Sequence, residues 1–357
     1  MSEADYIVVL DTGSTDGTFE RLKSDPRIAR AEQKTYKRFR FDKARNDSMK
    51  LIPQDAEILV CTDIDEVFSK GWADALRSRW ADGETTRCHY KYVWSHSEAG
   101  EEENVFTYDK IHTRDYSWHY PVHEVLVRND PSFAESCIDL SDSITLDHWQ
   151  SEKDRKFYFD LLKLAVKENI DDCHIRMLLA REYFLSGDYA NAEKVYLETL
   201  GLPTIDDADQ RLVLLCSLFQ LSLCYYEQSN FDEAIWYCQE FIKEDQSYRE
   251  PYLVMADCYN RMGMYTLSEG VLKSAREYAH QHRDWLEHSY SYHGWLEDTE
   301  SVAKWGLGKI DEAIEDVSLA IEHRPNDVRL LKNMNCFYAK KIEKLESELA
   351  EMRGISQ

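Results

Sequence analysis

The chain has 357 residues, enough for two ordinary domains, and its 43% hydrophobic and 31% charged residues are typical of a globular protein. Its 43 basic and 67 acidic side chains give a net charge of −24, which argues against a nucleic-acid-binding protein and against lasting contact with an anionic membrane. No apolar run reaches the roughly 18 residues of a membrane span, and residues 1–5 lack the pattern of a secretory signal. The nine cysteines are dispersed without a C-x-x-C pair, which predicts reduced thiols and a cytoplasmic protein.

The first 150 residues alternate short apolar runs with polar loops and predict an α/β domain. The elements expected in chain order are a strand over 6–10, helices over 18–23 and 42–52, a strand over 56–62, and aromatic-rich antiparallel strands over 87–94, 105–113 and 119–128. The first strand, helix and second apolar strand suggest a parallel sheet. Acidic loops begin at Asp11 and Asp63, directly after these two strands, and ligands of such sheets bind outside the carboxyl ends of the strands.

From residue 151 to 335 the pattern is helical and repeats itself. Equivalent turns begin at Gly187, Ser229, Gly263 and Gly308, spaced 42, 34 and 45 residues apart. A small residue follows five positions after each of these, which lets paired helices approach closely. This pattern resembles tetratricopeptide (TPR) repeats, with a helical bundle without repeats as the alternative. Lys304 stands where the other repeats have tyrosine, so the first helix of the fourth repeat departs from the pattern.

Residues 336–357 are expected to form a C-terminal helix. Ile342, Leu345, Leu349 and Met352 are spaced 3, 4 and 3 residues apart, which makes a short heptad-like stripe. Two heptads are too few for an independent coiled coil. The stripe is therefore expected to cap the repeats, and self-association through it stays an alternative.

The acidic motif at 63–66 reads DIDE. Acid-x-acid pairs arise by chance in so acidic a chain, and a strand-end turn or a helix N-cap also favours aspartate. Its place after a buried strand is more informative. Two carboxylates there can hold a hard divalent cation, which can in turn bind a diphosphate.

Residues 11–18 read DTGSTDGT, a polar loop that leads into a helix. The loop lacks the G-x-G-x-x-G spacing of dinucleotide-binding folds and the lysine of the phosphate loop, so neither a Rossmann dehydrogenase nor a phosphate-loop ATPase is supported. Asp11 can still present its carboxylate to a ribose or a base. Most of the other loop residues fit a capped turn.

A local reversal of charge follows this loop. Residues 21–45 carry ten basic and three acidic side chains in a chain that is acidic overall. Such a stretch can offset the charge of bound phosphates, or it can be an ordinary solvated face. The sequence leaves both possibilities open.

Three segments of the first 150 residues match one family. DTGSTDGT at 11–18 looks like the D-[DT]-G-S-x-D-G-[ST] segment, FDKARN at 41–46 like the [FY]-x-x-A-R-N segment, and DIDE at 63–66 like the D-x-D-E metal motif of family 2 glycosyltransferases with a GT-A fold. Their order and spacing also agree. PVHE at 121–124 resembles a later H-E segment of members that carry repeats behind the catalytic domain. The domain order is similar to that of sublancin-type S-glycosyltransferases.

The resemblance implies a GT-A-like mixed sheet domain over 1–150, TPR-like repeats over 151–335 and a C-terminal helix over 336–357. It implies metal-dependent, inverting transfer of a hexosyl group from a UDP-sugar or a GDP-sugar, with Mn²⁺ or Mg²⁺. The acceptor would be a protein, a peptide or a glycan. The repeats would bind this acceptor, a partner chain or a second copy of the chain.

The resemblance also implies roles for individual residues. The nucleotide and its diphosphate would be bound by Asp11, Arg45, Asn46 and Asp63. The metal would be held by Asp63, Asp65 and His148, although a lone histidine such as His148 can equally be a hydrogen-bonded packing residue. The proton of the acceptor would be taken by Glu124, with Glu66 as the second candidate and His123 as a residue that orients Glu124 or contacts the acceptor. Sugar rings would stack on Trp94, Trp118 and Tyr120, which otherwise belong to the core.

Two other interpretations stay open. The match starts at the second strand of the family's sheet, so part of the base pocket would come from elsewhere in the chain or from a partner chain. If it does not, the domain is a relic and the protein is a non-catalytic TPR adaptor. A metal-dependent nucleotidyltransferase or sugar-nucleotide hydrolase on a related scaffold is the other interpretation, and it differs from a glycosyltransferase in the products it releases.

Overall fold

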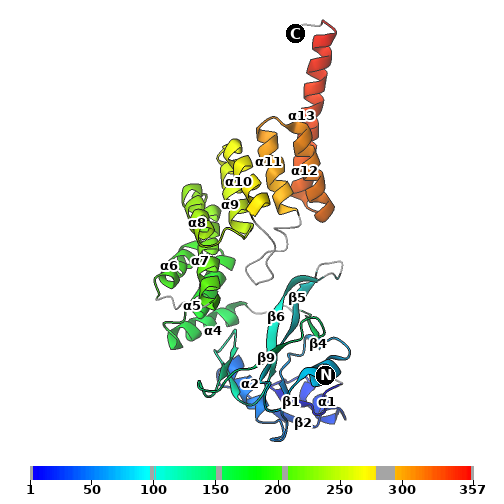
Figure 1. Ribbon diagram of the computed structural model, residues 1–357, viewed down its shortest axis with the longest axis vertical. Coiled ribbons are helices and arrows are strands. Elements are labelled where there is room, and N and C mark those ends of the chain that lie inside the picture. Colours follow the sequence, from blue (N-terminus) through cyan, green and yellow to red (C-terminus); the bar gives the residue numbers. More distant parts are fainter. Residues whose placement is uncertain are drawn as a thin grey trace. The chain divides into compact units, whose positions relative to one another are not determined.

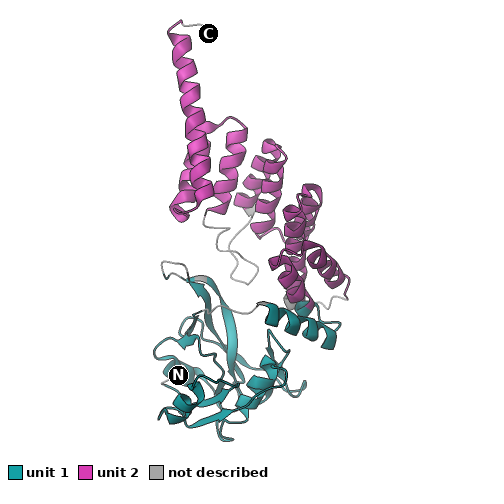
Figure 2. Cartoon of the chain, turned by 180° about the vertical axis from the view of Figure 1, so that it is seen from behind, with its two compact units in different colours: residues 1–175 teal, residues 176–357 magenta. Residues whose placement is uncertain are grey.

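The computed structural model describes residues 3–96, 100, 102–149, 155–202, 208–278 and 294–354. The chain divides into two compact units, residues 1–175 and 176–357, which Figure 2 shows in two colours. Unit 1 mixes strands and helices, and unit 2 is helical (Figure 1). The domain boundary expected at residue 150 lies outside the described residues. No helix in the described part of the chain is both long enough and apolar enough to cross a membrane.

The first strand of unit 1 belongs to a small sheet of its own. β1 (Val8–Asp11) pairs in parallel with β2 (Arg30–Gln33), and α1 (Thr18–Ser24) lies between them in the chain. The expectation that β1 shares a parallel sheet with the segment 56–62 is wrong. That segment supplies only β3 (Leu59–Val60), which pairs antiparallel with a later strand of another sheet. The sequence did not reveal β2 because its residues R-A-E-Q contain no apolar run.

The larger sheet has six strands, namely β3, β4 (Glu66–Phe68), β5 (Arg87–His96), β6 (Glu102–His112), β9 (Cys137–Asp139) and β10 (Thr145–His148). Their order is β3-β6-β5-β10-β4, with β9 paired to β5. β5 and β6 form a long antiparallel hairpin, as the sequence predicts. α3 (Trp72–Arg79) places Trp72 and Leu76 in one core with Tyr90 and Leu146 of the sheet.

A third sheet carries the PVHE segment. β7 (Tyr116–His119) and β8 (Val125–Arg128) pair antiparallel, so the single strand expected over 119–128 is in fact a hairpin turn followed by β8. Tyr120 and His123 in this turn have φ angles of 72° and 50°. Residues other than glycine rarely adopt this left-handed conformation, so the turn that leads to Glu124 is strained at Tyr120 and His123.

α2 (Phe41–Met49) contacts this hairpin at several points, and Asn46 bonds to β7. Nδ2 of Asn46 donates to the backbone oxygen of Trp118 at 2.7 Å, and the backbone N–H of Trp118 donates to Oδ1 of Asn46 at 2.9 Å. The two bonds fix the helix against β7. The neighbouring Arg45 is thereby held next to the PVHE segment.

From residue 155 onwards, the regular elements of the described residues are helices. They are α4 (Arg155–Glu168), α5 (Cys173–Leu185), α6 (Tyr189–Leu200), α7 (Ala208–Glu227), α8 (Phe231–Glu244), α9 (Glu250–Arg261), α10 (Tyr265–Tyr278), α11 (Trp295–Gly306), α12 (Ile310–His323) and α13 (Val328–Met352). α4 belongs to unit 1. Unit 2 follows as successive helix pairs, α7 with α8, α9 with α10 and α11 with α12, each packed on its neighbour.

The four turns predicted from the repeat are confirmed, because a new helix begins after each one. One residue in each turn has a positive φ, of 78°, 59°, 72° and 75°, at Gly187, Ser229, Gly263 and Gly308. The next backbone N–H in each turn donates to a carbonyl five residues earlier over 2.8 to 3.0 Å, in the pairs Asp188 to Tyr183, Asn230 to Tyr225, Met264 to Tyr259 and Lys309 to Lys304. This is the bond of a Schellman motif, which ends a helix and lets the chain reverse.

The small residues of the repeat are all buried. Ala192, Ala234, Ser268 and Ala313 have no exposed surface, so the helices of each pair approach closely at these positions. The helical part of the chain therefore consists of TPR-like repeats. The fourth repeat has a regular first helix, α11, despite its departure from the pattern. Its Lys304 forms an ion pair of 2.7 Å with Asp316 of α12 instead of an aromatic contact.

Candidate functional site

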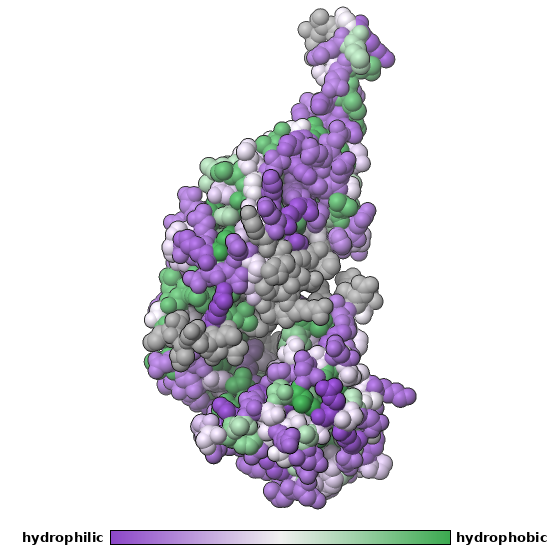
Figure 3. All heavy atoms as spheres, in the orientation of Figure 1, coloured by the Kyte–Doolittle hydropathy of each residue, from purple (hydrophilic) through white to green (hydrophobic). Residues whose placement is uncertain are grey.

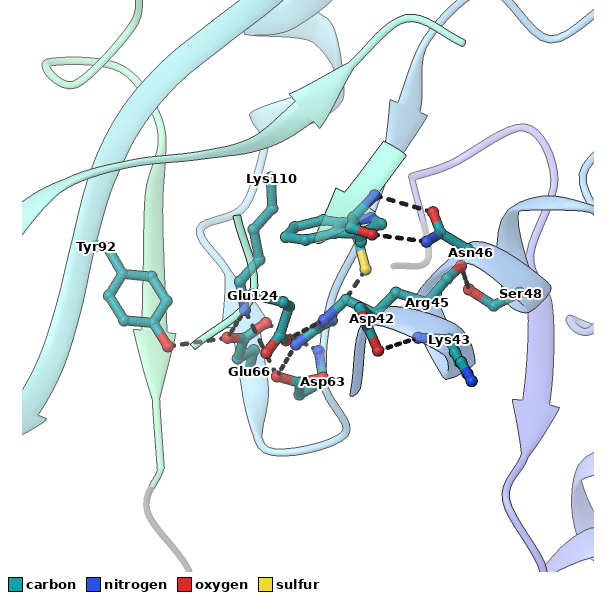
Figure 4. A network of polar contacts seen from close by, with 12 residues as sticks. Asp42, Lys43, Arg45, Asn46, Ser48, Asp63, Glu66, Tyr92, Lys110 and Glu124 are labelled. Atoms are coloured by element: carbon teal, nitrogen blue, oxygen red, sulfur yellow. Dashed lines mark hydrogen bonds and ion pairs between the residues drawn. The ribbon is translucent and has the colours of Figure 1, made fainter. Parts of the chain in front are cut away.

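Arg45 of α2 lies at the centre of a buried polar network (Figure 4). Its Nε donates to Oε1 of Glu124, and its Nη2 donates to Oδ2 of Asp63 at 2.9 Å. Its guanidinium lies 5.0 Å from the ring centre of Trp118. Burial lowers the pKa of Arg45, but its acidic neighbours outweigh burial and raise the pKa above its ordinary value. Arg45 therefore stays charged although it is buried.

A second buried cation, Lys110 of β6, completes the network. Its Nζ donates to Oε1 of Glu66 at 2.5 Å and lies 3.5 Å from Oδ2 of Asp63. Oη of Tyr92 also donates to Glu66, and the backbone N–H of Asp63 donates to the other oxygen of Glu66, both at 2.8 Å. Burial and the charge of Arg45 lower the pKa of Lys110, but the two carboxylates raise it to about 12. Both oxygens of Glu66 are thus engaged, and Glu66 holds the DIDE segment in place.

Sequence reasoning missed Lys110. The residue lies on an alternating strand, two positions from Tyr108 and two from the buried His112, so it points to the same face. A lysine at such a position signals a buried ion pair, because an unpaired ammonium group is rarely buried. With Lys110 included, the network holds three carboxylates and only two cations. Its surplus negative charge favours a bound cation over a bare anion.

Asp63 is the most accessible carboxylate of the network, with 46% of its side chain exposed. Burial of its carboxylate raises its pKa, but the charges of Arg45 and Lys110 outweigh this and hold the pKa at about 2. Asp63 is therefore ionised near neutral pH. Its exposed edge is free to accept hydrogen bonds from a ligand such as a ribose.

Asp65 and His148 form a separate pair. Nε2 of His148 lies 3.3 Å from Oδ2 of Asp65, and Nδ1 of the same ring lies 3.3 Å from the backbone oxygen of Trp94. A carbonyl oxygen can only accept, so this bond assigns the hydrogen to Nδ1. Nε2 then faces a carboxylate, an arrangement that requires a proton on Nε2 or a metal ion between the two groups.

The pair arises from the pairing of β10 with β4. His148 lies opposite Glu66 in the register, and the backbone N–H of Trp149 donates to the backbone oxygen of Asp65 at 2.8 Å. Two of the three predicted metal ligands thus meet, whereas the carboxylate of Asp63 bonds to Arg45 instead. No group of three or more potential ligands gathers within the described residues. A cation held by two side chains can take its other ligands from water or a diphosphate.

Asp11, at the end of β1, holds its own loop together. Its Oδ1 accepts from the backbone N–H of Gly13 and of Ser14 at 2.9 and 2.8 Å, and from Nε2 of Gln33 at 2.9 Å. Burial raises the pKa of Asp11, but hydrogen bonds from the side chains of Ser14 and Gln33 and from the backbone N–H groups of Gly13 and Ser14 lower it to about 2. The carboxylate is charged and serves as a turn cap. A contact with a nucleotide stays a prediction.

The PVHE hairpin contributes one residue to the network. Glu124 is 10% exposed and bonds to Arg45, whereas His123 is exposed in the strained turn. Of the aromatic candidates, Trp118 is buried under Arg45, and Oη of Tyr120 donates to Asp172. These two aromatic rings are packing residues in this structure.

Trp94 differs from them, because 38% of its surface is exposed. Its ring centre lies 4.7 Å from that of His148. An exposed indole beside the pair of candidate ligands is well placed to stack on a sugar or a base.

Two pockets of about 350 and 380 Å³ lie in unit 1. The second is lined by Asn46 and Trp118 among others, and neither is lined by Asp63, Asp65 or Glu124. The network and the Asp65–His148 pair therefore lie outside both pockets.

The chain matches no protein-family model and no curated protein. Solved structures with similar folds include the TPR protein TTC0263 of Thermus thermophilus, with 18% identity over 52% of this chain and 91% of that chain and a TM-score of 0.39. Others are MamA of Desulfovibrio magneticus RS-1, with 10% identity, 51% and 94% coverage and a TM-score of 0.39, and the first TPR domain of human RPAP3, with 20% identity, 37% and 96% coverage and a TM-score of 0.32. The glycosyltransferase resemblance stays a prediction.

Proposed function

We propose that unit 1 binds a nucleotide-diphosphate sugar together with Mn²⁺ or Mg²⁺, and that the protein transfers the sugar to an acceptor. The observation that carries this proposal is the convergence of Asp65 and His148, whose facing atoms are 3.3 Å apart. An imidazole nitrogen with its hydrogen on the far side and a carboxylate oxygen form a donor set that suits a divalent ion. The surplus negative charge of the adjoining network supports a cation there as well.

Each residue of the site would have a separate role. Asp65 and His148 would hold the metal ion, which when bound supplies charge stabilisation to the leaving diphosphate. Asp63 would accept hydrogen bonds from the ribose, with Arg45 behind it fixing its orientation. Trp94 would stack against the sugar or the base.

Glu124 would act as the general base. It would take the proton of an acceptor hydroxyl or thiol while the acceptor oxygen or sulfur attacks the anomeric carbon and the bond from that carbon to the diphosphate breaks. This single displacement inverts the anomeric centre. Because Glu124 bonds to Arg45 in this structure, the step requires one of its oxygens to face the acceptor, or Arg45 to turn towards the diphosphate. Unit 2 would bind the acceptor if that is a protein or a peptide.

Titration calorimetry with UDP and with GDP, each with and without Mn²⁺, tests the proposal. We expect one nucleotide to bind only in the presence of the metal, and Asp65→Ala and His148→Ala to weaken this binding at least about tenfold, since each removes one of two protein ligands. Asp74→Ala is the matched control, because its side chain is 93% exposed on α3. Absence of binding by both nucleotides, or equal binding by the wild type and both variants, would count against the donor site.

A second candidate is a TPR adaptor that does not catalyse a reaction. It needs only the TPR-like repeats described above, and it is supported by the engagement of Glu66 and Glu124 in ion pairs that would stabilise a fold without any ligand. An adaptor would bind its protein partner equally well with Asp65→Ala. A glycosyltransferase would lose release of nucleoside diphosphate in the same variant, so product analysis separates the two candidates.

A further inference from the structure

The packing of α13 changes at its middle. Leu330 and Phe337 are buried, and the Phe337 ring stacks on Trp305 of α11 at 5.9 Å between ring centres. From residue 338 to residue 354 no side chain is buried. Figure 1 shows this second half running past the ends of α11 and α12. The first half of α13 is therefore the cap of the repeats, and the helix begins at Val328 rather than at residue 336. The expectation that the stripe at 342–352 caps the repeats is wrong, because the second half buries none of its side chains against the described part of unit 2.

The second half nevertheless carries a regular apolar stripe. Its members are 45%, 55%, 54%, 42% and 78% exposed, in the order Tyr338, Ile342, Leu345, Leu349 and Met352. Their spacings of 4, 3, 4 and 3 residues place them on one face of the helix. Figure 3 shows hydrophobic residues among hydrophilic ones on this segment. Large apolar side chains in a continuous exposed row mark an interaction surface.

We propose that residues 338–352 pair with the same segment of a second copy of this chain as a short, parallel, two-stranded coiled coil. Ile342 and Leu349 occupy the a positions of the heptad, and Leu345 lies at the central d position. A β-branched residue at a next to leucine at d favours two parallel strands. This inference is independent of the function proposed for unit 1.

The flanking charges favour a second copy as the partner. In a parallel pair each g position faces the e position five residues later in the other helix. The pairs are Lys341 with Glu346 and Glu348 with Arg353, and both join opposite charges. Within one chain Lys341 bonds to Asp311 at 2.7 Å, so it exchanges one exposed carboxylate for another on pairing.

The same charges do not favour a membrane as the partner. Residues 338–353 contain four basic and four acidic side chains, so the segment has no net charge. An amphipathic helix that lies on an anionic membrane carries an excess of lysine and arginine on its polar face. Self-complementary signs fit an identical helix better.

The short length of the stripe is offset by the rest of the helix. An isolated helix of two heptads is marginal in water, because its first turn is costly to form. Here the helix already begins at Val328 and is anchored by Leu330 and Phe337 in the repeats. The projecting half only extends an existing helix, so the stripe is presented in a form ready to pair.

Sedimentation equilibrium of the full chain over a range of concentrations tests the proposal. We expect the average mass to rise from 42.0 kDa towards twice that value. Ile342→Glu combined with Leu349→Glu puts two carboxylates into the seam and should weaken self-association by more than about tenfold. A wild-type chain that stays at 42.0 kDa at the highest concentration, or a variant that dimerises like the wild type, overturns the proposal.

The matched control is Ser347→Glu combined with Ala350→Glu. It adds the same two charges to the outer f and b positions of the same helix turns and should dimerise like the wild type. At concentrations where the wild type is monomeric, the circular dichroism and the unfolding temperature of both variants should equal those of the wild type, since none of the four side chains is buried. Equal loss of the dimer in both double variants would mean that added charge alone disrupts the dimer. This result would contradict the proposal that the two helices pair through the apolar stripe.

Disulfide cross-linking tests the orientation. In a Cys336→Ser background, which removes one exposed thiol, Met352→Cys should form a covalent dimer under mild oxidation, because d residues of parallel helices face each other. Glu351→Cys, one position away on the outer face, should not. A dimer by mass that fails to cross-link at position 352 overturns the parallel arrangement.

Discussion

The two units of the chain bury different kinds of side chain. In unit 2, Ala192, Ala234 and Ala313 are fully buried at matching positions of successive helix pairs. In unit 1, Arg45 and Lys110 are buried together with the carboxylates that neutralise them. When one member of an apolar contact is replaced, the stability that is lost comes only from the apolar surface that is no longer buried. A charged network loses more, because removing one ion leaves its partner buried and uncompensated.

The largest expected effect follows from removing the central cation. Arg45→Ala leaves Glu124 and Asp63 without their bonds to the guanidinium and should lower the free energy of unfolding of unit 1 by about 3–5 kcal/mol. Urea denaturation, monitored by circular dichroism, measures this free energy of unfolding. Arg211→Ala is the control in unit 2, because the Arg211 side chain is 58% exposed and its 3.4 Å pair with Asp245 should contribute no more than about 1 kcal/mol. Similar losses in both variants would erase the contrast between the units.

The next largest effect is expected from placing a larger side chain between the two helices of one pair. Ala234→Leu adds three carbon atoms at a site without exposed surface and should cost about 1–3 kcal/mol in the stability of unit 2. Glu233→Leu makes the same new side chain at an exposed neighbouring position and should change stability by no more than about 0.5 kcal/mol. Thermal unfolding of both variants is the measurement. An unaffected Ala234→Leu would mean that the helices do not depend on a small residue there.

Acidification should weaken the Asp11 loop. The pKa of Asp11 is about 2 in the folded chain, below its ordinary value of 3.8, so the bonds it accepts contribute stability above that value and lose it as the pH falls towards 2. The contribution is about 2 kcal/mol. Asp11→Asn removes the titration, so its stability relative to the wild type should improve as the pH falls through this window. A difference that stays constant from neutral pH to pH 2 would contradict the role of the carboxylate.

The smallest effect concerns the turn residue of the second repeat. Ser229 adopts a φ of 59° where the other three turns have glycine, so Ser229→Gly should raise the unfolding free energy of unit 2 by about 0.5–1 kcal/mol. The reverse change, Gly263→Ser, should lower it by a similar amount. A serine side chain at position 263 would meet no atom within 4 Å at Cβ, so the test isolates the backbone. Changes of equal sign in the two variants would contradict the conclusion that the positive φ angle favours glycine at this turn position.

The two units also differ in how much of their structure could be predicted from the sequence. The turns of unit 2 follow from contacts between residues close in sequence, so Gly187, Gly263 and Gly308 mark them directly. In unit 1 the motifs identified Arg45 and Asp63, and the structure joins them across 18 residues. Such long-range pairs are set by strand order, which local patterns do not encode.

Three features of unit 1 were not predicted from the sequence. β2 has no apolar run, and the register of β10 with β4 decides that His148 meets Asp65. Lys110 belongs to no motif and joins the network only because β6 runs beside β3. The sequence could name candidate ligands, but the pairing of strands determines which of them share a location.

The bonds between Asn46 and Trp118 have a consequence for how the protein avoids aggregation. Among the described residues, β7 and β8 form a two-stranded sheet, so the edge of β7 would offer unpaired backbone groups to strands of other molecules. The amide of Asn46 supplies one donor and one acceptor to the backbone of a single residue, as an adjacent strand would. A helix side chain thus covers one residue of this sheet edge. Asn46→Asp would remove the donor and reopen that edge to unwanted partners.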